Sequence, residues 1–250
     1  MGYKGRDIEV YITDDGFCLV ASCDSCGAIG SKTLDLLKVP AGVVGQLTAR
    51  VALMEVLCTG AQPRIMTVAV SAEPDPTGKE IIKGVRQELE RAGFKDLPLA
   101  ISTEKNFTPR QTGLGIGVTG TCRISDLRVA RSRPGDRVYC LGIPRVGKEV
   151  TQTPADEIIG TAWIQTLLNR SGVHDLVPVG SRGILAETRG LARQISTEFI
   201  PVPDPGLDLH KPAGPSTCAI FTVDPAWKPA GTGPLPLTRI GRLTDTQIKP

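Results

Sequence analysis

One acidic, glycine-containing stretch, Cys23–Lys32, constrains this chain more than any other. It follows the apolar run Phe17–Ser22, which predicts a buried strand. That strand would place Asp24 on a loop that carries two glycines and ends in Lys32. A carboxylate can hold a hard cation such as Mg²⁺, while glycine N–H groups and a lysine can surround a phosphate. Taken alone, the stretch favours the alternative, a plain glycine turn with a surface lysine, so the rest of the chain has to decide between them.

Composition narrows the class of protein. A chain of 250 residues suits one large domain or two small ones, and 40% hydrophobic with 22% charged residues is typical of a globular protein. The 29 basic and 26 acidic residues nearly balance, and no basic cluster is interleaved with aromatics, so we expect no nucleic-acid partner. No apolar run approaches the roughly 20 residues of a membrane span, and the N-terminus lacks a signal-peptide core. These features predict a cytoplasmic protein without a membrane partner.

The seven cysteines favour buried, reduced thiols, because most of them lie in apolar runs. Cys23 and Cys26 form the one closely spaced pair. A zinc site would need two further ligands, and the only histidines, His174 and His210, are far away in sequence. We therefore expect these thiols to pack rather than to bind metal or carry redox chemistry.

The first half of the chain mixes strands and helices. Asp14-Asp15-Gly16 is a turn signal that predicts a hairpin between its flanking strands. The glycine–aliphatic alternation near residues 112–120 indicates a strand with another backbone, a helix or a ligand close to one face. The pattern predicts an α+β layered domain. Its expected strands are Asp7–Thr13, Phe17–Ser22, Arg64–Ala72, Leu97–Ser102 and Thr112–Ile124, and its expected helices are Gln46–Thr59 and Lys79–Ala92.

Three acids stand out in this half. Asp24 and Glu104 each come just after a predicted strand, and Glu104 lies in a polar loop with Asn106. Glu55 lies inside a predicted helix among apolar neighbours, where a carboxylate is costly unless a cation or a donor meets it. A solvated helix surface is the alternative for Glu55.

The second half is expected to be a separate domain that begins near Ser125. His174 beside Asp175 suggests a structural pair, and Ser181 and Arg182 lie on a glycine-bearing loop before a helix. The expected helices are Thr153–Arg170 and Ile184–Gln194, the expected strands are Val173–Val179, Cys218–Val223 and Leu237–Thr244, and Pro201–Pro215 is expected to be a long loop.

The segment Arg50–Pro63 resembles the helix-to-loop motif of an ATP-using superfamily. That superfamily contains aminoimidazole ribonucleotide (AIR) synthetase, thiamine monophosphate kinase, selenophosphate synthetase and the hydrogenase maturation dehydratase. Met54-Glu55 stands where the superfamily has Asn-Asp, and Asp24 matches its strand-end Asp. Ser102–Lys105 is similar to its Gly-Gly-Asp/Glu-Thr segment, and Arg133–Gly142 resembles the segment that opens its second domain.

The resemblance implies an α+β fold of two α/β-layer domains. Residues 1–124 would bind ATP and Mg²⁺ and would form a homodimer by joining strands into a shared β-barrel, and residues 125–250 would be a shortened C-terminal α+β domain. The implied metal ligands are Asp24, Glu55 and Glu104, the implied ATP-binding residues are Gly27, Gly30, Lys32 and Asn106, and the implied catalytic residues are Asp24, Lys32 and Glu104.

Within the superfamily, Asp24–Asp35 together with Thr103–Phe107 most resembles the α-ribazole kinases. This resemblance implies an ATP-dependent kinase that phosphorylates the ribose primary hydroxyl of α-ribazole, a nucleoside-like substrate, in cobalamin lower-ligand salvage. The rival interpretations are a thiamine monophosphate kinase, an ATP-dependent cyclo-ligase or dehydratase, and a degenerate nucleotide-binding module. The chain contains neither a Walker-type phosphate loop nor a Rossmann fingerprint after a strand.

Overall fold

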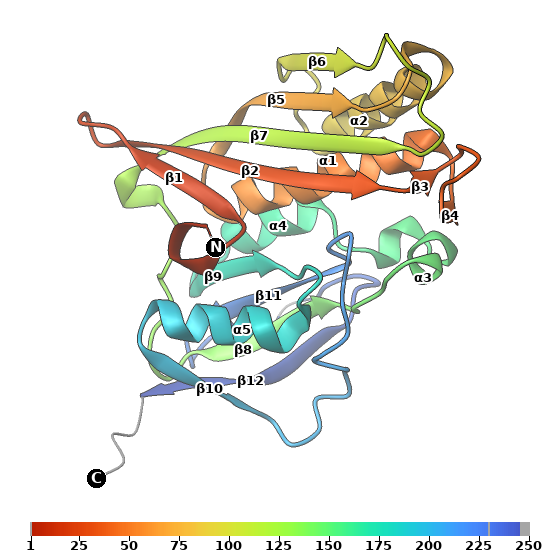
Figure 1. Ribbon diagram of the computed structural model, residues 1–250. Helices are drawn as coiled ribbons and strands as arrows, with labels where there is room; N and C mark the ends of the chain where they lie inside the picture. Colours follow the sequence, from red (N-terminus) through yellow and green to blue (C-terminus); the bar gives the residue numbers. More distant parts are fainter. Residues whose placement is uncertain (1, 230, 246–250) are drawn as a thin grey trace. The chain divides into compact units, whose positions relative to one another are not determined.

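The computed structural model describes residues 2–229 and 231–245, which form two compact units (Figure 1). The N-terminal unit comprises Asp7–Leu57 and Ala61–Leu127. The C-terminal unit comprises the described residues among 1–6, 58–60 and 128–250. Among the described residues, none of the helices combines the length and the apolar character that a membrane crossing requires.

The N-terminal unit is built on a five-stranded sheet in the order β1-β2-β7-β5-β6. The predicted hairpin is confirmed, since β1 pairs antiparallel with β2 and Ile8 lies opposite Ser22. β5 and β6 are parallel, and the other neighbours are antiparallel. This mixed sheet with helices confirms the expected α/β-layered class. Its strands are β1 (Ile8–Ile12), β2 (Phe17–Gly27), β5 (Gln62–Val70), β6 (Leu99–Thr103) and β7 (Gly113–Arg123).

The position of Asp24 differs from the prediction. β2 does not end at Ser22 but continues to Gly27, so Asp24 lies within the strand, opposite Ile116. The strand continues because β7 runs beside it as far as Gly113 and supplies backbone partners. β2 is also half-buried rather than buried, since its residues alternate between the two faces of the sheet.

Helices α1 (Ala41–Leu57) and α2 (Lys79–Arg91) cover one face of this sheet (Figure 1). α1 begins earlier than the predicted Gln46. Glycines let the two helices approach closely, because a Cβ on Gly84 would lie 1.9 Å from the carbonyl oxygen of Gly42. The shorter elements of the unit are β3 (Ile29–Gly30), β4 (Leu37–Lys38), the π-helical turn η2 (Pro74–Gly78) and the 3₁₀ turn η3 (Ile124–Asp126).

The glycine-rich strand β7 meets different surroundings on its two faces. On the helix side, a Cβ on Gly120 would lie 2.6 Å from the side chain of Val56, so this glycine permits close packing of α1. On the open side, a Cβ on Gly115 would have no atom of the described chain within 4 Å. The expectation of a close neighbour is therefore confirmed for the helix face, while the open face carries nothing from the described residues at this point.

The C-terminal unit contains a second five-stranded sheet in the order β10-β12-β8-β11-β9. Helix α5 (Gly183–Gln194) packs on it around a core that includes Ile184, Leu191 and Ile220. The strands are β8 (Arg137–Gly142), β9 (Val173–Pro178), β10 (Thr197–Pro201), β11 (Cys218–Val223) and β12 (Leu237–Asp245). The remaining elements are η1 (Tyr3–Gly5), α3 (Lys148–Gln152), η4 (Ala155–Glu157) and α4 (Thr161–Leu168).

The predicted helix over residues 153–170 is confirmed only in its second half, as α4, and its predicted start at Thr153 is wrong. The chain forms the short turn η4 and then α4, with Ile158 and Gly160 extended between them. Gly160 has φ −132° and ψ 175°, a conformation outside the helical region. Neither α3 nor β10 is predicted by the sequence pattern.

Candidate functional site

Asp24 is the most perturbed acid of the N-terminal unit. It lies on the face of β2 that packs against α1, the same face as Ser22, whose hydroxyl donates to the Ala52 carbonyl at 2.8 Å. Burial raises the pKa of Asp24 to about 6, and the negative charge of Asp7 adds to this rise. A backbone hydrogen bond from Ser25 opposes it only in part. A carboxylate in this position is stabilised by a bound cation, which is the property expected of a metal ligand.

The stretch after Asp24 is fixed by Asp35. Its Oδ1 accepts the Thr112 N–H at 2.7 Å, and its Oδ2 accepts the Thr112 hydroxyl and the Lys32 N–H, both at 2.8 Å. Burial would raise the pKa of Asp35, but these hydrogen bonds outweigh it and lower the pKa. Gly30 has φ 154°, and a Cβ there would lie 2.3 Å from the Thr112 hydroxyl oxygen. Asp35 is therefore the residue that holds the glycine stretch against β7, a role that the sequence did not indicate.

Lys32, which is expected to bind phosphate, forms an ion pair with Glu73. The two side chains are 9% and 19% exposed, and Glu73 also accepts a hydrogen bond from Thr77. Burial would raise the pKa of Glu73, but the Lys32 and Thr77 contacts lower it. A phosphate bound by Lys32 would therefore share the positive charge of Lys32 with Glu73.

Glu104 lies directly after β6 and is half-buried. Its Oε1 accepts the N–H of Asn106 at 2.6 Å and that of Phe107 at 3.3 Å. These backbone hydrogen bonds lower the pKa of Glu104. The predicted catalytic acid and the predicted ATP-binding Asn106 thus share one tight turn.

The three predicted metal ligands do not meet at one point. Glu104 follows β6 and Asp24 lies on β2, three strand spacings away, or about 14 Å. Because α1 runs antiparallel to β2, Asp24 and Glu55 lie on opposite sides of the Ser22–Ala52 contact, separated by roughly 11 Å along the two elements. Within residues 2–229 and 231–245, no group of three or more His, Cys, Asp or Glu residues is placed to hold a metal ion.

A single magnesium ion nevertheless fits part of this arrangement. Mg²⁺ keeps several waters and is commonly held by one or two carboxylates together with substrate phosphates. Asp24 carries the raised pKa that a cation would relieve, and Asp7 is the acid whose charge acts on it. The donor set therefore suits a hydrated Mg²⁺ at Asp24 but not an ion bound by all three predicted acids at once.

Cys23 and Cys26 cannot act as a pair. They lie three positions apart on β2, so their side chains point to opposite faces of the sheet. Cys23 is exposed and Cys26 is half-buried. Burial raises the pKa of Cys26 to about 11, with Asp24 and Asp35 adding to the rise. The Cys26 thiol is thus protonated near neutral pH, in keeping with the expected packing role.

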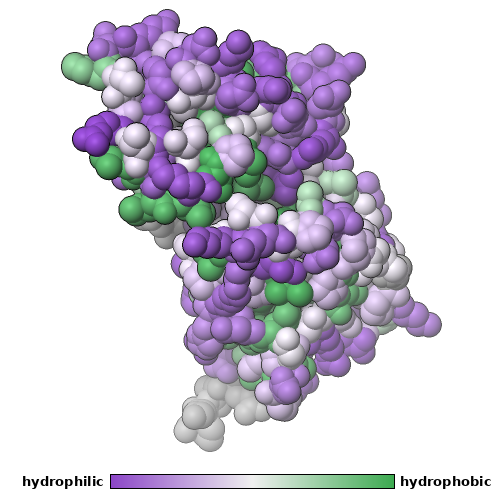
Figure 2. Space-filling view, turned by 90° about the vertical axis from the view of Figure 1, so that its right-hand side faces the viewer, coloured by the Kyte–Doolittle hydropathy of each residue, from purple (hydrophilic) through white to green (hydrophobic). Residues whose placement is uncertain are grey.

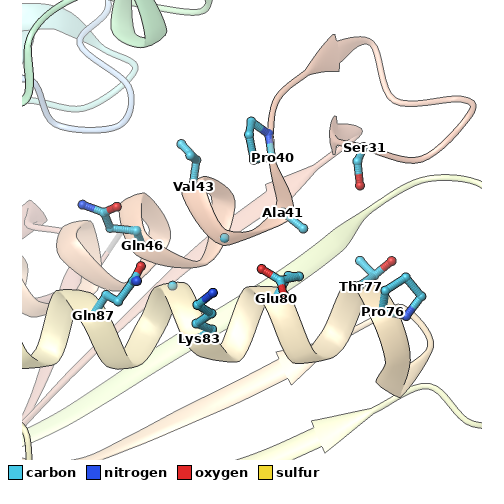
Figure 3. Close-up of a pocket in the computed structure, with 12 residues that line it drawn as sticks. Ser31, Pro40, Ala41, Val43, Gln46, Pro76, Thr77, Glu80, Lys83 and Gln87 are labelled. Carbon is cyan, nitrogen blue, oxygen red and sulfur yellow. The ribbon is translucent and has the colours of Figure 1, made fainter.

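A pocket of about 350 Å³ lies between the N-terminal parts of α1 and α2 (Figure 3). Its volume is within the range of small-molecule sites. The sequence did not reveal it, because it depends on the close approach of Gly42 and Gly84. Its polar lining residues are Ser31, Gln46, Thr77, Glu80, Lys83 and Gln87.

The residues singled out in the C-terminal unit pair with other side chains of that unit. His174 Nδ1 contacts Asp136 Oδ2 at 2.7 Å rather than its neighbour Asp175, whose Oδ2 accepts the Ser132 hydroxyl at 2.6 Å. Burial raises the pKa of Asp136, although the His174 contact opposes it. Arg182 forms an ion pair with Glu187, with Nη2 3.1 Å from Oε2, and Ser181 is exposed beside it. These contacts join side chains of the C-terminal unit to one another and so hold that unit together.

Comparison with solved structures identifies the class of fold. The chain is similar to thiamine monophosphate kinase from Aquifex aeolicus, with a TM-score of 0.69 and 15% identity over 96% of this chain and 89% of that chain. It is similar to the hydrogenase maturation protein HypE from E. coli, with a TM-score of 0.67 and 18% identity over 91% of this chain and 80% of that one. It is also similar to the structure of AaThiL complexed with AMPPCP and TMP, with a TM-score of 0.66 and 15% identity over 97% of this chain and 85% of that chain.

The sequence itself identifies the family of the N-terminal part. Residues 5–121 match the model of the AIR synthase related protein, N-terminal domain. This stretch is therefore an AIR synthase-related N-terminal domain, and the expected relation to the superfamily is confirmed. No curated protein matches the sequence.

Proposed function

We propose that this protein is an ATP-dependent kinase that phosphorylates a small aromatic molecule at a Mg²⁺ site around Asp24. The observation that carries the proposal is the half-buried Asp24 carboxylate, whose pKa is raised to about 6, within a domain of the AIR synthase-related family. The similar AaThiL structure holds AMPPCP and TMP, which supports ATP as the phosphoryl donor.

The residues of the N-terminal unit would act by positioning and by charge. Asp24, with Asp7 beside it, would bind the cation, and Glu55 and Glu104 would face it through water or through the substrates. Gly27, Gly30 and Asn106 would present backbone and amide groups to the phosphates, and Lys32 would offset their charge. Bound magnesium supplies charge neutralisation on the phosphates. No covalent enzyme intermediate is needed, because phosphoryl transfer depends chiefly on alignment and electrostatics.

Two acceptors are proposed, thiamine monophosphate and α-ribazole. Similarity to thiamine monophosphate kinases from Aquifex aeolicus and Stenotrophomonas maltophilia supports the first. The resemblance of Asp24–Asp35 to α-ribazole kinases supports the second, and with it a place in cobalamin lower-ligand salvage, while Met54-Glu55 departs from the Asn-Asp of thiamine monophosphate kinases. A stable phosphorylated acceptor identifies a kinase, whereas a cyclo-ligase gives a ring and free phosphate. A degenerate module gives neither.

The open face of the N-terminal sheet supports a homodimer. Phe17 and Leu19 of β2 and Ile65 of β5 are 38–42% exposed there. Gly115 leaves the neighbouring β7 backbone uncovered by the described residues. A second copy packed on this face would close a shared barrel and bury these side chains. Leu19→Lys should then convert a dimer to a monomer in light scattering. A cytoplasmic location also belongs to this proposal.

Binding of Mg–AMPPCP tests the donor site. Isothermal titration should give a defined Kd for the wild-type chain and a large loss of affinity for Asp24→Asn. Glu55→Gln tests the helix acid separately, and Glu90→Gln, at an exposed position on α2, is the matched control. If Asp24→Asn binds Mg–AMPPCP as tightly as the control does, the site is wrongly assigned. An unchanged Glu55→Gln would remove Glu55 alone from the metal set.

A further inference from the structure

Phe107 is the most exposed large aromatic side chain among the described residues, at 78%. It lies on the loop that joins β6 to β7. Tyr11 is also exposed, at 68%, whereas Tyr139, Phe221 and Trp227 pack together in a cluster. An apolar ring left in water costs free energy that a ligand can recover. Figure 2, which faces the right-hand side of Figure 1, shows a mostly hydrophilic surface with smaller groups of hydrophobic residues.

The backbone that carries this ring is ordered. Glu104 Oε1 accepts the Phe107 N–H at 3.3 Å and the Asn106 N–H at 2.6 Å. Further along the same loop, the Arg110 carbonyl accepts the Leu34 N–H at 3.0 Å. The loop is thus tied at one end to the predicted catalytic acid and at the other to the glycine stretch. A ring carried on an ordered backbone loses less conformational entropy when it binds than one carried on a flexible loop.

We infer that Phe107 recognises the aromatic heterocycle of the phosphoryl acceptor by stacking. The inference rests on the proposed function and names the residue that selects its substrate class. A phenyl ring stacks on heterocycles of many kinds, because each has an aromatic face. Thiamine monophosphate and α-ribazole both carry such a ring, so Phe107 suits either acceptor and disfavours a purely aliphatic alcohol.

The position of Phe107 favours the acceptor over the adenine of ATP. Its N–H donates to the carboxylate of Glu104, which in the proposed function faces the cation and, through it, the phosphoryl group that is transferred. The acceptor oxygen must meet that phosphoryl group, whereas adenine is held at the opposite end of the triphosphate. The ring of Phe107 therefore lies on the acceptor's side of the site.

The test measures acceptor binding in the presence of saturating Mg–AMPPCP, so that no turnover is required. Thiamine monophosphate and α-ribazole are titrated separately against the wild-type chain, Phe107→Ala and Phe107→Tyr. We expect Phe107→Ala to raise the Kd of the acceptor at least about tenfold, with the Kd of AMPPCP unchanged, and Phe107→Tyr to retain acceptor binding. Ile124→Ala is the matched control, since Ile124 is 48% exposed and follows the far end of β7.

Each outcome bears on a separate claim. Acceptor affinity that is equal in the wild type and in Phe107→Ala overturns the inference and leaves the proposed kinase intact. A rise in the Kd of AMPPCP in Phe107→Ala would place the ring on adenine and also overturn the inference. A wild-type chain that binds AMPPCP but neither acceptor refutes both the proposed acceptors and the inference. Failure to bind AMPPCP itself refutes the proposed function.

Discussion

Replacing Asp24 by asparagine should stabilise the folded chain at neutral pH. Burial raises the pKa of Asp24 from 3.8 to about 6, so the folded state binds its proton more tightly than the unfolded state does. At about 1.4 kcal/mol per pH unit, ionised Asp24 lowers the free energy of unfolding by about 3 kcal/mol above pH 6. Asparagine keeps the shape and removes the charge, so it should recover most of this free energy.

The sign of the pH dependence follows from the same linkage. Below pH 3.8 Asp24 is protonated in both states, so wild type and Asp24→Asn should be equally stable. Between pH 3.8 and about 6 the unfolded state releases the proton first, and the wild type loses stability relative to the variant as the pH rises. Above that range the difference should stay constant.

Urea denaturation of both proteins at a series of pH values measures this difference directly. The difference between the two free energies of unfolding at each pH cancels the titration of all other groups. Asp96→Asn, at an exposed position, serves as the control. A wild type that is as stable as Asp24→Asn at pH 8 would refute the conclusion that the partial burial of this carboxylate lowers stability. The stabilised variant should also have lost Mg–AMPPCP binding. This result would show that Asp24 lowers the free energy of unfolding in exchange for ligand binding.

Two further predictions concern the packing of α1 on α2. Arg50→Met should lower the free energy of unfolding by about 3–5 kcal/mol in urea, because it leaves the buried carboxylate of Glu88 without its partner 2.8 Å away; adding Glu88→Leu should restore most of the loss. Gly84→Ala should lower the melting temperature, since its Cβ meets the Gly42 carbonyl and overpacking costs about 1–3 kcal/mol, whereas Gly190→Ala in α5, with only a flexible arginine end within 4 Å, should not lower it. The ion-pair prediction is contradicted if the double variant Arg50→Met/Glu88→Leu is no more stable than Arg50→Met alone. The glycine prediction is contradicted if Gly84→Ala melts at the same temperature as the wild type or at a higher one.

Local sequence signals predict the strands and helices of the N-terminal unit well. The turn at Asp14–Gly16 defines the first hairpin, and the glycine–aliphatic alternation defines β7, because both depend on neighbours in sequence. The extent of β2 is not predicted, since Cys23–Gly27 becomes strand only through backbone pairing with distant residues of β7. The helix expected from Thr153 fails for a local reason, the extended conformation at Gly160.

The sequence predicts the residues of the candidate site but not their geometry. Asp24, Glu55 and Glu104 each fit a cation or a phosphate by their chemistry, but their separation follows from the order of strands across the sheet, which is set by long-range pairing. The roles of Asp35 and Glu73 are invisible for the same reason. Each acts on a partner far away in sequence, Thr112 for Asp35 and Lys32 for Glu73.

Phosphoryl transfer tests the central claim most directly. The wild-type chain is incubated with Mg–ATP and, in separate reactions, with thiamine monophosphate, α-ribazole and other nucleosides, and the products are identified by mass. We predict that one aromatic acceptor gains the mass of a single phosphoryl group as ADP accumulates, and that Asp24→Asn abolishes this gain. Release of free phosphate without a phosphorylated acceptor, or no consumption of ATP with any acceptor, would contradict it.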